Sequence, residues 1–200
     1  MSPSEFIYFH HPSNVYAVRN TANQGGAFSI SSFVGSIAIK NSFFQSNNAT
    51  LRAGAVLITG CQDLLIDNCT FDQNGAGGTG GVMDLSGALA TVQIQNCNFT
   101  NNTASLGGVL YASQTNLPVV LQNNVFKNNV ASNTGGVISF ESSTFAFSIN
   151  DNSNIFENNQ AKSGGVLSFS KHTGPIQLQH ATFKGLFIYI YIYIYIYNFN

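Results

Sequence analysis

Apolar and aromatic positions recur along this chain with a period of about 27 residues. One marker is a phenylalanine three residues before an asparagine (Phe-x-x-Asn), and a sixth phenylalanine, Phe183, is in register without its asparagine. A second marker is the last glycine of a Gly-Gly-like pair. Successive markers of each kind lie 27 to 30 residues apart, so the chain is built from internal repeats. The markers are Phe44, Phe71, Phe99, Phe126 and Phe156, and Gly26, Gly54, Gly81, Gly108, Gly136 and Gly165.

Around these markers, apolar residues lie two positions apart, which is typical of strands with alternate side chains pointing inward. Each repeat is predicted to contain three short strands. The first spans paired aliphatic residues such as Leu64 and Ile66, the second ends on the phenylalanine, and the third follows the glycines. An alanine such as Ala104 recurs five residues after each phenylalanine. No pattern of period 3.6, as a helix requires, runs through any repeat.

Two corners are expected in each repeat. The parity of the inward positions changes at an asparagine, a residue that tolerates a left-handed backbone, and the glycine pair marks a place for positive φ or close backbone approach. Repeats of this kind stack at about 4.8 Å per coil. A spacing of 30 before Phe156 indicates a small insertion near Asn150 to Ser153. The asparagines of the first corner are Asn41, Asn68, Asn96 and Asn123.

The sequence therefore predicts an all-β fold, a single-stranded, right-handed parallel β-helix of about six coils. A leucine-rich solenoid, the main alternative, expects a helix and regular leucines, and the repeats show neither. Residues 1–24 are assigned to a partial coil or an N-terminal cap, residues 25–185 to the β-helix, and residues 186–200 to a low-complexity tail. Because the repeat fades into this tail without a polar cap, the chain is interpreted as a piece of a longer protein or a faulty gene model.

The tail contains ten alternating isoleucines and tyrosines, Ile188 to Tyr197. We interpret it as a translated TA-dinucleotide tract, with a real edge strand as the alternative. Even with Leu186 and Phe187 the apolar run falls short of the roughly 20 residues of a membrane helix. The chain also begins without the basic and apolar regions of a signal peptide.

Charged residues make up 8% of the chain, against about 25% in typical globular proteins. The formal net charge is −1, so the chain lacks the basic surface that nucleic acid or anionic lipid requires. The best candidate for an enzyme site is an acidic group within about one coil, with Arg52 as the nearest basic residue in the sequence. Solvated surface charge is the favoured interpretation of this group, because no carboxylate recurs in adjacent coils. Its members are Asp63, Asp67, Asp72 and Asp84.

Three cysteines do not form a disulfide framework. Cys69 and Cys97 share one column, and we expect buried free thiols because parallel side chains hold their Cβ atoms slightly too far apart for a bond. Cys61 lies near a corner and is expected to be more exposed. The histidines are too scattered in register for a metal site, and no cofactor is expected. They are His10, His11, His172 and His180.

Four Asn-x-Thr motifs occur, at Asn48, Asn68, Asn98 and Asn101. Asn68 belongs to the first corner and is expected to be inaccessible. In an asparagine-rich chain such motifs support secretion only weakly.

The pairing of Phe126-Lys127-Asn128-Asn129 with Gly136-Val137-Ile138 resembles the repeats of the polymorphic outer membrane protein family. The resemblance covers about Gly25 to Phe183. It implies a β-helix of the pectin-lyase-like kind, displayed at a surface, with adhesion or host contact as its role. We therefore expect a non-catalytic structural or adhesive segment of a larger surface or membrane-attached protein, with a surface protein or glycan as partner. The alternative is a polysaccharide lyase or glycosidase on the same scaffold.

Overall fold

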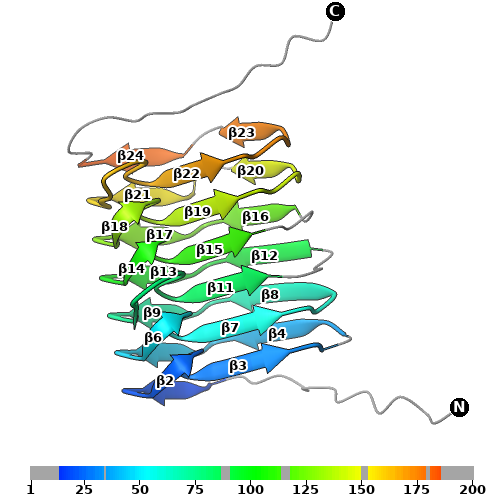
Figure 1. The fold of residues 1–200 in the computed structure, drawn as a ribbon, viewed down its shortest axis with the longest axis vertical. Coiled ribbons are helices and arrows are strands. Elements are labelled where there is room, and N and C mark those ends of the chain that lie inside the picture. The colour runs from blue at the N-terminus through cyan, green and yellow to red at the C-terminus, as the bar shows by residue number, and fades with distance from the viewer. Residues whose placement is uncertain are drawn as a thin grey trace, which may run out of the picture.

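The computed structural model describes residues 14–33, 35–86, 91–113, 118–149, 153–178 and 181–185. All regular elements in these ranges are strands, and every pairing between them is parallel. The strands form four sheets that run the length of the molecule (Figure 1). Residues 1–13 and the Ile-Tyr tail at 186–200 lie outside the described residues, as do His10, His11 and His180.

Sheets I and II carry the aliphatic pairs and the phenylalanines. Sheet I consists of β4 (Ile37–Lys40), β8 (Asp63–Asp67), β12 (Thr91–Gln95), β16 (Val119–Gln122), β20 (Phe147–Ile149) and β23 (Ile176–Leu178). Sheet II consists of β1 (Tyr16–Val18), β5 (Phe43–Gln45), β9 (Thr70–Asp72), β13 (Asn98–Thr100), β17 (Val125–Lys127), β21 (Ile155–Glu157) and β24 (Thr182–Lys184).

Sheets III and IV lie before and after the glycine pairs. Sheet III consists of β2 (Thr21–Gln24), β6 (Asn48–Arg52), β10 (Gly75–Ala76), β14 (Thr103–Leu106) and β18 (Val130–Thr134). Sheet IV consists of β3 (Phe28–Ser31), β7 (Val56–Thr59), β11 (Met83–Ser86), β15 (Leu110–Ser113), β19 (Ile138–Glu141) and β22 (Leu167–Ser170).

The chain passes through the four sheets in turn and then begins the next coil. Paired residues such as Phe99 and Phe126 are 27 apart in sequence, which confirms the predicted β-helix and its period. In Figure 1 the near strands β3, β7 and β11 run to the right, the far strands return to the left, and the chain climbs from its N-terminal end. This winding is right-handed, as expected.

The prediction of three strands per coil was wrong, because sheet III supplies a fourth. Each strand of sheet III has little more than one apolar side chain that points toward the core. In β6 this residue is Ala49, which is 1% exposed. A single inward alanine produces no alternation that a sequence pattern could reveal. The predicted insertion is supported by the pairing offset, which rises from 28 residues at Val119 and Phe147 to 30 at Val125 and Ile155. Residues 150–152 lie outside the described ranges.

Both predicted corners are present. Asn41, Asn68, Asn96 and Asn123 all have positive φ, between 49° and 56°. The two glycines of a pair meet different demands. Gly107 has a φ of 64°, whereas a Cβ on Gly108 would lie 2.2 Å from the carbonyl oxygen of Gly136 in the next coil. The pair is therefore required for a left-handed turn and for close stacking of successive coils.

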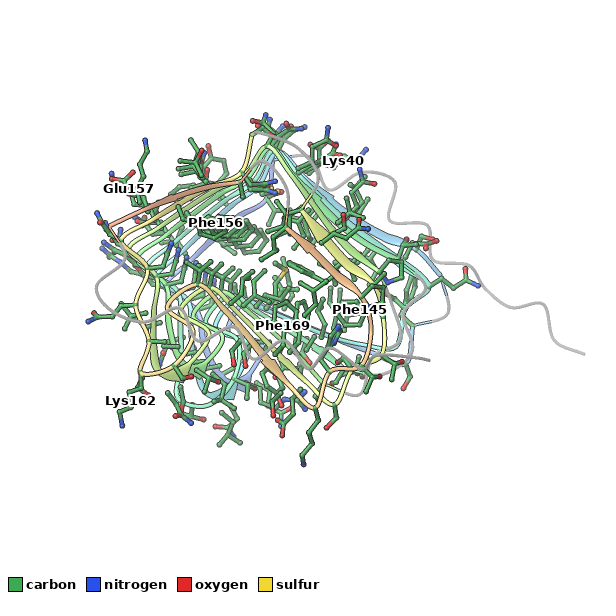
Figure 2. The ribbon with its side chains drawn as sticks, turned by 90° about the horizontal axis from the view of Figure 1, so that it is seen from above. Lys40, Phe145, Phe156, Glu157, Lys162 and Phe169 are labelled. Atoms are coloured by element: carbon green, nitrogen blue, oxygen red, sulfur yellow. The ribbon has the colours of Figure 1, made fainter. Side chains whose placement is uncertain are left out.

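A continuous stack of phenylalanine rings forms the centre of the core. The rings of Phe44, Phe71, Phe99, Phe126, Phe156 and Phe183 are stacked with centroids 4.8 to 5.1 Å apart. Seen along the axis, Phe156 and Phe169 point into the interior while Glu157 and Lys162 point outward (Figure 2). The spacing of the rings follows from the spacing of parallel strands.

Candidate functional site

The four carboxylates of the predicted acidic group lie on three different sheets. Asp63 and Asp67 are on β8 of sheet I, Asp72 is on β9 of sheet II, and Asp84 is on β11 of sheet IV. Alternation points them away from the core on these separate sides of the coil. The converging carboxylates that an enzyme site of this group requires are therefore not formed.

Three of these carboxylates, those of Asp63, Asp67 and Asp72, accept hydrogen bonds from neighbouring coils. Asp63 accepts from the hydroxyls of Ser36 (3.0 Å) and Thr91 (2.6 Å). Asp67 accepts from the carboxamide of Asn96 at 2.9 Å. These bonds link neighbouring coils, so the side chains act as rungs of polar ladders on the outer surface.

Asp72 has the most donors of the three. Its carboxylate accepts from Thr100 at 2.6 Å, Asn101 at 2.9 Å and Gln45 at 3.2 Å. Partial burial disfavours the charged form, but these three donors together outweigh it and lower the pKa of Asp72. The carboxylate is thus kept ionised as a structural acceptor.

Asp84 differs from the others because it is fully buried although it lies on the outer side of sheet IV. Arg52 donates to its carboxylate from Nη2 at 2.6 Å and from Nε at 2.9 Å, and the Thr79 hydroxyl donates as well. Arg52 also donates to the hydroxyl of Ser86 at 2.8 Å. The hydrogen bond to Asp84 raises the pKa of Arg52, despite partial burial of the guanidinium. The guanidinium of Arg52 is held charged, and its two hydrogen bonds to Asp84 join neighbouring coils.

The next two coils continue this polar group on sheet IV. Tyr111, paired with Asp84 in the neighbouring strand, donates its hydroxyl to Glu141 at 2.8 Å. Burial, and after it this hydrogen bond, raises the pKa of Tyr111 to about 12. We call Arg52, Asp84, Tyr111 and Glu141 the sheet IV polar cluster. It brings together two acids, a base and a phenol across four coils.

Sequence reasoning identified Arg52 and Asp84 but missed Tyr111 and Glu141. For Tyr111 a signal was present, because it is the third residue after the second glycine, a position that every repeat keeps in register. That position varies where the core columns do not: it is occupied by Leu57, Asp84, Tyr111 and Ser139. When an outward-pointing position keeps its place in the repeat but changes its residue type, its side chains are expected to have a role outside the core.

All three cysteines are buried free thiols. For Cys69 and Cys97 this agrees with the prediction, and the backbone N–H of Cys69 donates to the sulfur of Cys97 at 3.4 Å. Cys61 contradicts the expectation of greater exposure, since it is 3% exposed within the core cluster. The left-handed Gly60 before it turns its side chain inward, and burial raises the pKa of Cys61 to about 11.

His172, one of the histidines judged too scattered for a metal site, lies against the rings of Phe145 and Phe169, with centroids 5.2 Å away in each case. Burial lowers the pKa of His172. Within the described ranges, no three His, Cys, Asp or Glu side chains gather as a metal site would require.

Asn68 was predicted to be inaccessible, and this was wrong. Its side chain is exposed and donates to Asn41 at 2.7 Å in an outer ladder. The buried ladder is instead made by the asparagines of the Phe-x-x-Asn motif, which are Asn47, Asn74, Asn102, Asn129 and Asn159. The error arose because the left-handed residue of a corner points outward, and the residue after it points inward.

One comparison with known protein families connects this geometry to a named repeat. Residues 96–113 match the Chlamydia polymorphic membrane protein repeat. The matched segment begins at the left-handed corner of Asn96, contains Phe99, Asn102 and the Gly107-Gly108 pair, and ends with β15. The matched segment thus covers three sides of one coil, β13 to β15, in agreement with the parallel β-solenoid.

No curated protein and no solved structure matches the chain. Across the described segments, no helix has the length and apolar character needed to cross a membrane. The family match associates the repeat with a structural segment of membrane-associated proteins.

Proposed function

We propose that this chain is a non-catalytic β-helix segment of a larger surface or membrane-attached protein, with a structural or adhesive role. The observation that carries the proposal is the match of residues 96–113, three sides of one coil, to the polymorphic membrane protein repeat. The stacking of further coils in the same register supports it, since such stacks build long, rigid faces for contact.

The sheet IV polar cluster is the surface proposed for contact. Most side chains that recur from coil to coil pack in the core, in the phenylalanine stack or in the hydrogen-bonded ladders. The residues of this cluster, in contrast, do not recur from coil to coil. Its solvent-accessible charges are those of Arg52 and Glu141, which are partly exposed, whereas Asp84 and Tyr111 are buried beside them. Such a surface suits a protein or glycan partner, because it offers hydrogen bonds without the net positive charge that nucleic acid requires.

Adhesion of cultured cells to beads coated with the full chain tests this proposal. We expect coated beads to bind cells and the Tyr111→Phe/Glu141→Gln variant to bind fewer, because it removes a hydroxyl and a charge without changing side-chain volume. Gln122→Glu, on the outer side of sheet I, is the matched control and is expected to bind normally. Equal loss in both variants, or no binding above uncoated beads, would argue against the proposal.

The enzyme alternative has its own direct assay. The four acidic residues named for it lie on separate sheets, and Asp84 is fully engaged by Arg52 and Thr79. We therefore expect no unsaturated product when the chain is incubated with polygalacturonate and calcium. Appearance of that product would establish a lyase and overturn the non-catalytic assignment.

A further inference from the structure

The four Asn-x-Thr motifs occupy two different kinds of surface position. Asn48 and Asn98 are the first residues of strands β6 and β13. Asn68 and Asn101 are corner residues with φ of 51° and 57°. All four asparagines are exposed, so burial does not distinguish them, but their local geometry does.

At the strand positions, alternation places the asparagine and the threonine on one solvent-facing side. In Asn48–Ala49–Thr50 the middle residue is 1% exposed, and in Asn98–Phe99–Thr100 it is 0% exposed. The outer residues of each triplet therefore point away from the core together, about 7 Å apart along the strand. The carboxamide of each asparagine lies at the start of a strand, outside the corner ladders, while the hydroxyls of Thr50 and Thr100 donate to Asn23 and Asp72.

At the corner positions, the carboxamide nitrogen is already used. Asn68 donates to Asn41 at 2.7 Å, and Asn101 donates to Asp72 at 2.9 Å while accepting from Asn128 at 3.4 Å. A substituent on the nitrogen would remove one of its two hydrogens and occupy space beside the next coil. The corner ladders therefore oppose modification at these two residues.

We propose that Asn48 and Asn98 are acceptor sites for N-linked glycans when the chain passes through a compartment that holds an oligosaccharyltransferase. The co-reactant is a polyprenyl-pyrophosphate-linked oligosaccharide. The side-chain nitrogen of asparagine bonds to the anomeric carbon of the first sugar as the bond from that carbon to the pyrophosphate oxygen breaks. The pyrophosphate leaves with the electron pair, the nitrogen loses one proton, and no oxidation or reduction takes place.

Glycans at these two sites would cover particular faces of the solenoid. Asn48 lies on sheet III and Asn98 on sheet II, and the strands of sheets I and IV contain no Asn-x-Ser/Thr motif. Sheets I and IV would thus stay bare, including Asp84, Tyr111 and Glu141 of the sheet IV polar cluster, whereas its fourth member, Arg52, ends the strand that Asn48 begins. The inference stands apart from the proposed adhesive role, since it depends only on the motifs and their local geometry.

Expression of the full chain behind a secretion leader in cultured eukaryotic cells tests the inference. Protein is collected from both cells and medium, so that poor export does not hide the result. Peptide N-glycosidase F is expected to lower the mass and to convert Asn48 and Asn98 to aspartate. The Asn48→Gln/Asn98→Gln variant is expected to lose the mass shift completely.

The matched control is Asn133→Gln, an exposed asparagine of β18 that lies outside any motif, and it is expected to keep the full shift. Absence of any mass change in the parent chain would overturn the inference. So would a shift that persists in the double variant, because the glycans would then be on Asn68 or Asn101.

Discussion

Two corners flank sheet II, with the same backbone geometry and different interiors. Each has a left-handed residue followed by a buried, inward-pointing one. In the second corner every inward residue is an asparagine. In the first corner the inward residues are mixed: Ser42, Cys69, Cys97, Asn124 and Asn154.

The asparagines of the second corner form a saturated ladder. The carboxamide of Asn102 donates to Asn129 and to the carbonyl of Phe71, both at 3.0 Å, and its oxygen accepts from the backbone and side chain of Asn74. In the first corner Asn124 bonds the carbonyl of Ile94 at 2.8 Å in the same manner. The sulfur of Cys97 reaches the equivalent carbonyl, that of Ile66, only at 3.8 Å. The two corners thus share one backbone geometry, but side-chain hydrogen bonds hold the second corner more completely than the first.

The largest expected effect is a difference between two matched truncations. Asn102→Ala removes four buried hydrogen bonds and leaves their partners unsatisfied, so we expect a loss of about 4 kcal/mol in the free energy of unfolding. Cys97→Ala removes only weak sulfur contacts and a small volume, for a loss of about 1 kcal/mol. Urea denaturation of both variants measures the difference. Similar losses would show that the ladder contributes nothing beyond filling space.

Extending the ladder is expected to stabilise the first corner. In Cys69→Asn/Cys97→Asn, the new carboxamides lie where the thiols already contact the carbonyls of Ile39 and Ile66. They extend the ladder of Asn124 by two coils, because the backbone N–H of Cys97 already donates to the Asn124 carboxamide. We expect a gain of about 1–2 kcal/mol, measured as a raised urea midpoint. A lowered midpoint would mean that the column has no room for carboxamides.

Stability should also respond to pH through buried thiols, which the second corner lacks: Cys97 lies in the first corner, and Cys61 lies between β7 of sheet IV and β8 of sheet I. The hydrogen bond with Cys69, together with burial, raises the pKa of Cys97, and burial raises that of Cys61 from 9.0 to about 11. A thiol with a raised pKa favours the folded state while it is neutral, so its contribution is complete below pH 9.0 and is lost as pH rises through about 11. Stability measured from pH 7 to 11 is expected to fall less in Cys61→Ala/Cys97→Ala than in the parent chain. Identical profiles would contradict this assignment.

The smallest effect is expected in the exposed ladder of the first corner. Asn96 donates to Asp67 and accepts from Asn123 in contact with solvent, and its φ of 56° suits glycine. Asn96→Gly should therefore cost about 0.5 kcal/mol, because water replaces the lost bonds. Thermal unfolding provides the measurement. A loss as large as that of Asn102→Ala would remove the distinction between outer and inner ladders.

Much of the fold could be predicted from sequence because each coil repeats the same physical requirements. The Phe99 column, the Asn96 corner and the Gly107-Gly108 pair each recur with one period, and each is a condition of stacking. Sheet III was missed since Ala104 alone leaves no alternating pattern. The direction of Asn68 was mistaken because sequence parity does not show which of two adjacent corner residues turns inward.

The candidate site was less predictable, because it depends on contacts between coils at positions that do not repeat. Arg52 and Asp84 are 32 residues apart, and their ion pair forms because Arg52 ends β6 beside the outer face of the next coil. Tyr111 and Glu141 are joined across 30 residues. A repeat alignment identifies such positions as variable, but only the folded coils show which of them meet.

The most direct test of the stacked-coil architecture is a distance between spin labels on Gln45→Cys and Glu157→Cys. These residues occupy one outward column of sheet II, linked through Asp72, Thr100 and Lys127 by four successive parallel pairings. The native cysteines are buried and should not take up label. Pulsed dipolar spectroscopy is expected to give a narrow distribution near four strand spacings, about 19 Å between backbones. A broad distribution, or a narrow one centred well away from that value, would contradict the in-register stack.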